Sequence, residues 1–281
     1  MMDKYYHHAG LKLHYLDWGG GGEAILFLHG TTGNAHHWDF CARRLQENFR
    51  VLALDFRGHG DSDKPASGYR KEDYLADVTA LIRELELKRV SLVGYSLGAL
   101  VSLACAAQNP DLVRAVLVDP SIGTPPGIIA HYQRMAAAAP PSFSDREDIH
   151  TYFYKKYGRD VDLTLLEEYI KWGFLPDTPM PGQWSWKHSR QAAVETFATR
   201  VEDNHLYLPH ISCPTLFIRA QNSQMFSPAA WNNLQEMGKG NFLFAEVPDA
   251  DHGLILQRPD VVADLICNFL LDVHAPSRHR Q

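Results

Sequence analysis

The chain has 281 residues, of which 45% are hydrophobic and 21% charged, and its formal net charge is −6. These are values of an ordinary globular protein, so they exclude extended disorder, and a chain of this length buries roughly three quarters of its unfolded surface. No run of Lys and Arg is long enough for a nucleic-acid-binding face, and no stretch of eighteen apolar residues is present that would span a membrane.

The cysteines and histidines exclude two further classes of protein. The four cysteines are widely separated and form no Cys-x-x-Cys pair, so we expect reduced thiols in the core. No His-x-x-x-His motif with a nearby carboxylate is present, so neither a metal site nor another cofactor is expected. The N-terminus lacks the apolar run of a signal peptide, which favours a cytoplasmic protein.

Apolar strand-like runs alternate with helical periodicity through most of the chain. Two β segments are expected between Tyr5 and Trp18. In chain order there follow a strand at 24–28, a helix at 38–46, a strand at 51–54, a helix at 69–85, a strand at 90–94, a helix at 99–108, and strands at 113–118, 214–218 and 241–245, with helices at 229–237 and 259–271. This alternation predicts an α/β fold with a mainly parallel sheet and helices on both faces. Ligands of such sheets bind beyond the carboxyl ends of the strands.

The alternation stops between residues 121 and 212. This segment is rich in aromatic residues and prolines and has helical stretches at 162–171 and 190–201 but no strand-like run. We expect a helical lid inserted over the carboxyl edge of the sheet, with most of its aromatic residues in its own core and a few facing a cavity. The expected domains are a core formed by 1–120 and 213–281 and a lid formed by 121–212.

A serine stands between two glycines where a strand turns sharply into a helix. The sequence Gly94-Tyr95-Ser96-Leu97-Gly98 has the Gly-x-Ser-x-Gly spacing that lets strand and helix approach closely around a strained serine. The turn would present the hydroxyl at the N-terminus of the helix, where free N–H groups favour negative charge. Ser96 is therefore a candidate nucleophile.

The chain resembles the α/β-hydrolases of the lidded esterase type over nearly its whole length. Four segments occur in the order and spacing of that family: 29–33 (HGTTG), 55–62 (DFRGHGDS), 94–98 (GYSLG) and 250–253 (ADHG). The resemblance implies Ser96 as nucleophile and His252 as general base. It also implies an oxyanion hole made by the backbone N–H groups of Thr31 and Leu97, with a Thr31 or Thr32 hydroxyl as a possible further donor. His29 and His59 would support loops.

The acid of the triad is where the sequence departs from this family. The family places an aspartate after the strand at 214–218, whereas here residues 219–225 contain no carboxylate and Ser223 or Gln224 occupies that position. We expect Asp119, at the end of the preceding strand, to serve instead, because spoiling the aspartate of such a triad costs a factor of about 10⁴ in rate. The alternatives are a Ser–His dyad helped by Asn222 or Ser223, and a lid carboxylate such as Glu195. Asp251 is expected to point away from His252.

Serine chemistry favours hydrolysis of a small or medium apolar ester, lactone or thioester, with a small molecule as the partner. A serine at this position also argues against the epoxide and halide chemistry that a carboxylate nucleophile performs in this fold. One alternative is a carbon–carbon bond hydrolase of the same fold that acts on a vinylogous diketone. Another is a ligand binder without catalytic activity, which the missing carboxylate near Ser223 would suit. The sequence alone indicates no oligomeric state.

Overall fold

The computed structural model describes residues 1–158, 160–176, 182–200, 204–237 and 240–272. Their centre is an eight-stranded sheet with the strand order β1-β2-β4-β3-β5-β6-β10-β11. The strands are β1 (Met2–His8), β2 (Leu11–Gly19), β3 (Ala24–Leu28), β4 (Arg50–Leu54), β5 (Val90–Tyr95), β6 (Arg114–Val118), β10 (Thr215–Ala220) and β11 (Phe242–Val247). The pairs β1–β2 and β2–β4 are antiparallel and the others parallel, which confirms the predicted fold class.

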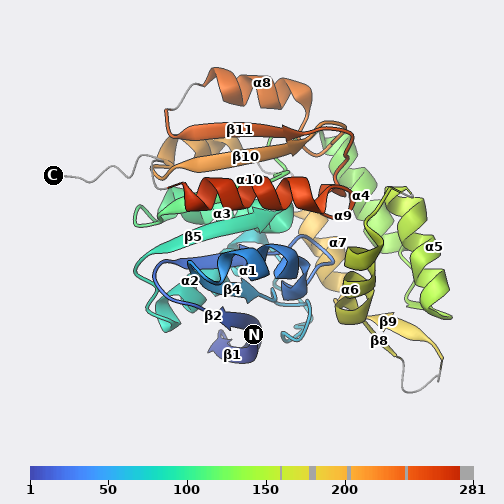
Figure 1. The fold of residues 1–281 in the computed structure, drawn as a ribbon. Coiled ribbons are helices and arrows are strands. Elements are labelled where there is room, and N and C mark those ends of the chain that lie inside the picture. The colour runs from blue at the N-terminus through green and yellow to red at the C-terminus, as the bar shows by residue number, and fades with distance from the viewer. Residues whose placement is uncertain (159, 177–181, 201–203, 238–239, 273–281) are drawn as a thin grey trace.

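Helices cover both faces of the sheet (Figure 1). Side chains alternate across each strand, so Leu26 and Leu28 of β3 join one apolar core while Ile25 and Phe27 join the other. The first core is closed by α2 (Lys71–Glu84), α3 (Leu97–Gln108) and α8 (Pro228–Glu236), and the second by α1 (Asp39–Leu45), α9 (Leu254–Gln257) and α10 (Pro259–Leu271). This two-sided burial explains the unbroken apolar runs of the central strands. All four cysteines are buried and free.

The segment between β6 and β10 lies at one end of the sheet (Figure 1). Its helices are α4 (Pro126–Ala138), α5 (Arg146–Tyr157), α6 (Leu163–Gly173) and α7 (Arg190–Ala198), followed by the 3₁₀ helix η2 (Asn204–His210). It also holds a small antiparallel sheet of β7 (Ser142–Phe143), β8 (Phe174–Pro176) and β9 (Trp184–Trp186). The expectation that this segment contains no strands was wrong, because strands of two or three residues are too short to show a period in the sequence. No helix in the described residues is both long enough and apolar enough to cross a membrane.

The turn between β5 and α3 is strained and tightly packed. Ser96 has φ 52° and ψ −106°, a backbone conformation that residues other than glycine rarely adopt. A Cβ atom on Gly98 would lie 2.0 Å from the carbonyl oxygen of Leu28, and one on Gly94 would lie 2.1 Å from the carbonyl oxygen of Gly98. The two glycines therefore allow α3 to begin directly against β3 and β5. This contact fixes the position of Ser96.

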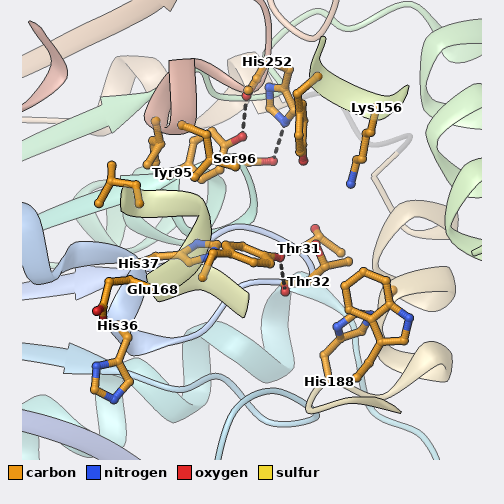
Figure 2. A pocket seen from close by; sticks show the side chains of 18 of the residues that line it. Thr31, Thr32, His36, His37, Tyr95, Ser96, Lys156, Glu168, His188 and His252 are labelled. Carbon is orange, nitrogen blue, oxygen red and sulfur yellow. Dashed lines mark hydrogen bonds between the residues drawn. The ribbon is translucent and has the colours of Figure 1, made fainter. Parts of the chain in front are cut away.

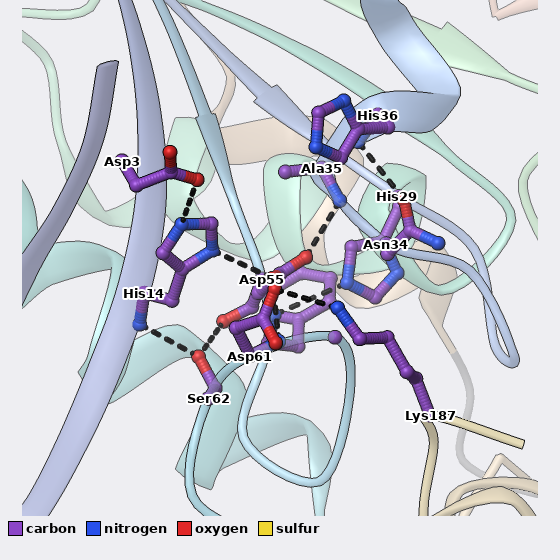
Figure 3. A network of polar contacts seen from close by, with 12 residues as sticks. Asp3, His14, His29, Asn34, Ala35, His36, Asp55, Asp61, Ser62 and Lys187 are labelled. Carbon is purple, nitrogen blue, oxygen red and sulfur yellow. Dashed lines mark hydrogen bonds and ion pairs between the residues drawn. The ribbon is translucent and has the colours of Figure 1, made fainter. Parts of the chain in front are cut away.

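A buried polar network fixes the loop that follows β3 (Figure 3). One carboxylate oxygen of Asp55 accepts a hydrogen bond from the N–H of Ala35 at 2.6 Å, and the other accepts from the N–H of Asp61 at 2.9 Å. The second oxygen also lies 2.7 Å from Nδ1 of His14. Burial alone would raise the pKa of Asp55, but the hydrogen bond and charge of His14 outweigh it and lower this pKa to about 2. The same contact raises the pKa of His14, against the opposing effect of burial.

We expect Gly98→Ala to unfold the chain or to lower its melting temperature by at least 5 °C, because the added methyl group meets backbone atoms that cannot move independently. Gly127→Ala is the matched control, since nothing lies within 4 Å of a Cβ atom at that helical position. Thermal unfolding followed by circular dichroism measures both. Equal melting temperatures for the two variants would contradict this account of the turn.

We expect Asp55→Asn to reduce the free energy of unfolding by about 3 kcal/mol near pH 5, because it leaves His14 without its buried partner. The lowered pKa of Asp55 means that its contribution is present above about pH 4 and is lost as the pH falls toward 2. The raised pKa of His14 means that its contribution is present below pH 6.5 and is lost at higher pH. Urea unfolding at several pH values should therefore show the largest difference between wild type and variant from about pH 4 to 6.5. Asp111→Asn, a substitution at an exposed position, is the control. It should show no pH range in which its stability differs from that of the wild type.

Candidate active site

Three side chains from distant parts of the chain form one chain of hydrogen bonds at the carboxyl end of the sheet. Nε2 of His252 lies 3.0 Å from Oγ of Ser96, and Nδ1 of His252 lies 2.7 Å from Oδ2 of Asp119. Ser96 follows β5, Asp119 follows β6, and His252 stands on the loop after β11. The phenol of Tyr95 donates to the carbonyl oxygen of His252 and holds that loop (Figure 2). The structure thus brings together the three residues that we expected from the sequence.

Asp119 is fully buried, and its carboxylate has three hydrogen-bond partners. Oδ1 accepts from the N–H of Ala220 at 3.1 Å, and Oδ2 accepts from the hydroxyl of Ser223 at 2.5 Å as well as facing His252. Ser223 occupies the position where the resemblance led us to expect an acid. Here its hydroxyl donates to the carboxylate that stands on the neighbouring strand.

The other acidic candidates lie elsewhere. The Asp251 carboxylate accepts from the N–H of Gly253 at 2.7 Å, so it turns back onto its own loop. Glu195 binds the amide of Gln191 at 2.5 Å on the surface of α7. In the described part of the chain, Asp119 is the carboxylate that contacts His252.

Two backbone N–H groups lie where an oxyanion hole is expected. Leu97 is the first residue of α3, so its N–H points out of the helix N-terminus beside Ser96. Thr31 follows Gly30, whose absent Cβ atom would lie 3.3 Å from Cβ of Ser96. Neither N–H donates a hydrogen bond to another described residue. His29 supports the loop that carries Thr31, because its Nδ1 lies 2.7 Å from the carbonyl oxygen of Gly30 and its Nε2 accepts from the N–H of Phe56 at 3.1 Å.

A cavity of about 280 Å³ opens over Ser96 and His252. Its size is at the small end for a ligand pocket. Six aromatic side chains of the inserted segment line it: Tyr132, Tyr152, Tyr157, Tyr169, Trp186 and Phe197. Phe143, Phe153 and Phe174 instead pack together in the core of that segment. The sequence could not separate these two groups, because both occur in short helices and turns with weak periodicity.

Arg200 is a further charged residue of the site that the sequence reasoning missed. Its guanidinium is buried, with Nη1 3.4 Å from Oγ of Ser96 and Nη2 2.5 Å from Oγ1 of Thr31. Burial lowers the pKa of Arg200 to about 10, so it stays cationic at neutral pH. Because the Thr31 hydroxyl oxygen accepts from Arg200, its own proton is left free to point elsewhere. No motif marks this arginine in the sequence, since it is a single cation at the end of an expected helix.

Three histidines near the site have buried ring nitrogens and are held neutral. Burial lowers the pKa of His37 to about 3, and it lowers the pKa of His188 well below its ordinary value. Both line the cavity (Figure 2). His59 lies behind them, and burial lowers its pKa to about 3 while its Nδ1 donates to the carbonyl oxygen of Arg57 at 3.0 Å. These imidazoles therefore add polarity to the cavity but no charge.

One group in the described residues brings possible metal ligands together. Ligand atoms of His14, Asp55 and Asp61 lie within 4.8 Å of one another. Each is already engaged, since His14 and Asp55 bond to each other and Asp61 pairs with Lys187 at 2.8 Å (Figure 3). The group acts as the structural network described above.

Comparison with known proteins identifies the family of the chain. The sequence profile described as "Alpha/beta hydrolase family" matches residues 25–265. A 2-(acetamidomethylene)succinate hydrolase of Mesorhizobium japonicum is 30% identical over 254 residues, which cover 89% of each chain. An N-formylmaleamate deformylase of Pseudomonas putida is 30% identical and covers 86% of this chain and 87% of its own.

Solved structures give the same result. A crystal structure of E-2-(acetamidomethylene)succinate hydrolase superimposes with a TM-score of 0.88 at 27% identity, over 96% of this chain and 98% of that one. The enol-lactonase of Burkholderia xenovorans shares the fold, with a TM-score of 0.76 at 23% identity over 95% of this chain and 99% of its own. The chain therefore belongs to the alpha/beta hydrolase family and is a hydrolase of the serine type.

Proposed function

We propose that the protein hydrolyses a small acyl compound through a covalent acyl-enzyme on Ser96. The observation that carries this proposal is the unbroken chain of hydrogen bonds from Asp119 through His252 to Ser96 at the base of an aromatic cavity. A serine hydroxyl becomes a nucleophile when a neighbouring base accepts its proton, and here that base is oriented by a buried carboxylate. An ester, lactone or thioester is the substrate class that the sequence favours.

The geometry supports the following sequence of steps. Oγ of Ser96 attacks the carbonyl carbon while its proton passes to Nε2 of His252, and the carbonyl electron pair moves onto oxygen. The N–H groups of Thr31 and Leu97 would bind this oxyanion, and Arg200 would place a positive charge beside it. His252 then gives the proton to the leaving group as the bond between carbonyl carbon and leaving group breaks. Water repeats the attack, and its proton returns through His252 to Ser96 as the acyl–Oγ bond breaks.

The charge of Arg200 is large enough to matter. Two unit charges about 4 Å apart interact by roughly 4 kcal/mol at an effective dielectric constant of about 20. Arg200 has no carboxylate partner among the described residues that would cancel its field. A developing oxyanion near Ser96 would therefore gain substantially from it.

A second candidate is hydrolysis of an acyl–nitrogen bond. The names of the two curated relatives denote an acetamido compound and an N-formyl compound. The same tetrahedral chemistry serves both bond types, provided that His252 protonates the departing nitrogen. The carbon–carbon bond hydrolase considered from the sequence uses the same residue types on a vinylogous diketone.

A fluorophosphonate probe tests the role of Ser96. We expect it to label the wild-type protein at Ser96, and we expect Ser96→Ala to lose both labelling and turnover. Rates on p-nitrophenyl acetate, p-nitrophenyl butyrate and p-nitroacetanilide then separate the bond types. Fast turnover of the two esters favours an esterase, and turnover of the anilide favours acyl–nitrogen chemistry. Absence of labelling would support a ligand binder without catalytic activity.

We expect Asp119→Asn to lower kcat by a factor of about 10⁴ while the fold is retained, because the amide no longer favours the tautomer and charge of His252 that the reaction needs. Steady-state kinetics with a p-nitrophenyl ester and circular dichroism measure the two effects. Asp251→Asn is the matched control and should keep activity within about threefold, since Asp251 makes no contact with the imidazole. Near-full activity of Asp119→Asn would remove it from the mechanism.

A further inference from the structure

Two cations stand around the cavity without a carboxylate partner in the described part of the chain. Among the described residues, the guanidinium of Arg200 forms hydrogen bonds only with hydroxyl oxygens, those of Ser96, Thr31 and Ser121, and it lies 4.6 Å from the centre of the Phe197 ring. Its Nε is buried without any hydrogen-bond partner there. Neutral hydroxyls leave the net charge of a guanidinium uncompensated, and a buried charge in that state is costly.

Lys156 is the second cation. It comes from α5, lines the cavity, and directs its amino group into it (Figure 2). Nζ lies 4.9 Å from the centre of the Tyr157 ring, and among the described residues it makes neither an ion pair nor a hydrogen bond. Burial lowers the pKa of this lysine. Lys156 is partly exposed, but its ammonium faces the cavity without an anionic partner among the described residues, so it is available to pair with an anion.

The carboxylates in the cavity wall do not supply that anion. Glu168 accepts from Nε1 of Trp172 at 3.0 Å and from Nζ of Lys171 at 3.3 Å. Asp39 faces Nδ1 of His36 at 3.1 Å. Each of these acids is bound to a partner on its own helix or on the turn just before it, and the lowered pKa values of His37 and His188 keep these two cavity histidines neutral. The inner cavity therefore carries a positive field from Lys156 and Arg200.

We propose that the substrate carries a carboxylate in addition to its scissile acyl bond, and that this carboxylate pairs with the ammonium of Lys156. Arg200 adds positive charge at the Ser96 end of the same cavity. This inference rests on the proposed function, since it names the class of acyl compound that the site takes. Lys156 is a binding and specificity residue in this account, and no proton transfer is assigned to it.

Binding to Ser96→Ala protein tests the inference without turnover. The probes are monoethyl succinate, glutarate and adipate, each compared with its diethyl ester by isothermal titration calorimetry at low ionic strength. We expect at least one monoester to bind tenfold or more tightly than its diester. Adding Lys156→Met should reduce that ratio to below threefold, whereas Lys156→Arg should preserve most of it.

Lys155→Met is the matched control, because it removes the same charge from an exposed position on the same helix. It should leave the ratio unchanged, and circular dichroism checks the fold of every variant. Equal binding of monoester and diester, no measurable binding of any monoester, or a ratio that survives Lys156→Met would each overturn the inference. Labelling of wild-type Ser96 reports on the proposed function separately, so failure of one can be told from failure of the other.

Discussion

The hydrogen bond between the Asp119 carboxylate and the His252 imidazole is the contact on which the site depends. It joins the end of β6 to the loop after β11, with β10 between them in the sheet. The parallel register aligns Val118, the last residue of β6, with Ile218 near the end of β10, so the carboxyl ends of these two strands lie close together. A carboxylate that moves from the end of β10 to the end of β6 therefore stays within reach of the same histidine. Ser223 stands after β10, where the resemblance led us to expect an acid. Its hydroxyl donates a hydrogen bond to the Asp119 carboxylate at the end of β6.

Three of the six non-glycine residues with positive φ in the described part of the chain lie at or near the site. Ser96, Asp119 and Thr32 all have positive φ values, of 52°, 45° and 72°. Such conformations cost roughly 1–3 kcal/mol each and persist only where the surrounding structure enforces them. Here the enforcement comes from the glycines of the β5–α3 turn, from the ladder between β6 and β10, and from the network around Asp55. The rigid half of the site is thus provided by the sheet and its loops.

The inserted segment contributes the other half. It covers these residues with aromatic rings and brings in two cations, Lys156 and Arg200. Because burial keeps His37 and His188 neutral, they do not add to the charge of the cavity, and Lys156 and Arg200 are its cations without a carboxylate partner among the described residues. The site therefore combines the triad of the core with cations and aromatic rings of the inserted segment.

The sequence by itself determined the parallel sheet and the position of the strained turn with its serine, because these follow from local periodicity and short-range steric requirements. The choice of His252 as base came from the resemblance of the chain to the α/β-hydrolases. It also favoured Asp119 as the acid, while a Ser–His dyad and a lid carboxylate such as Glu195 stayed as alternatives. The tertiary structure decided which of these candidates touches His252, which aromatic residues face the cavity, and that Arg200 lies beside Ser96. Those facts depend on contacts between residues more than a hundred positions apart, such as Ser96 with Arg200 and His252 with Asp119. No local pattern records such contacts, because each side chain meets its partner only after the sheet and the inserted helices have packed.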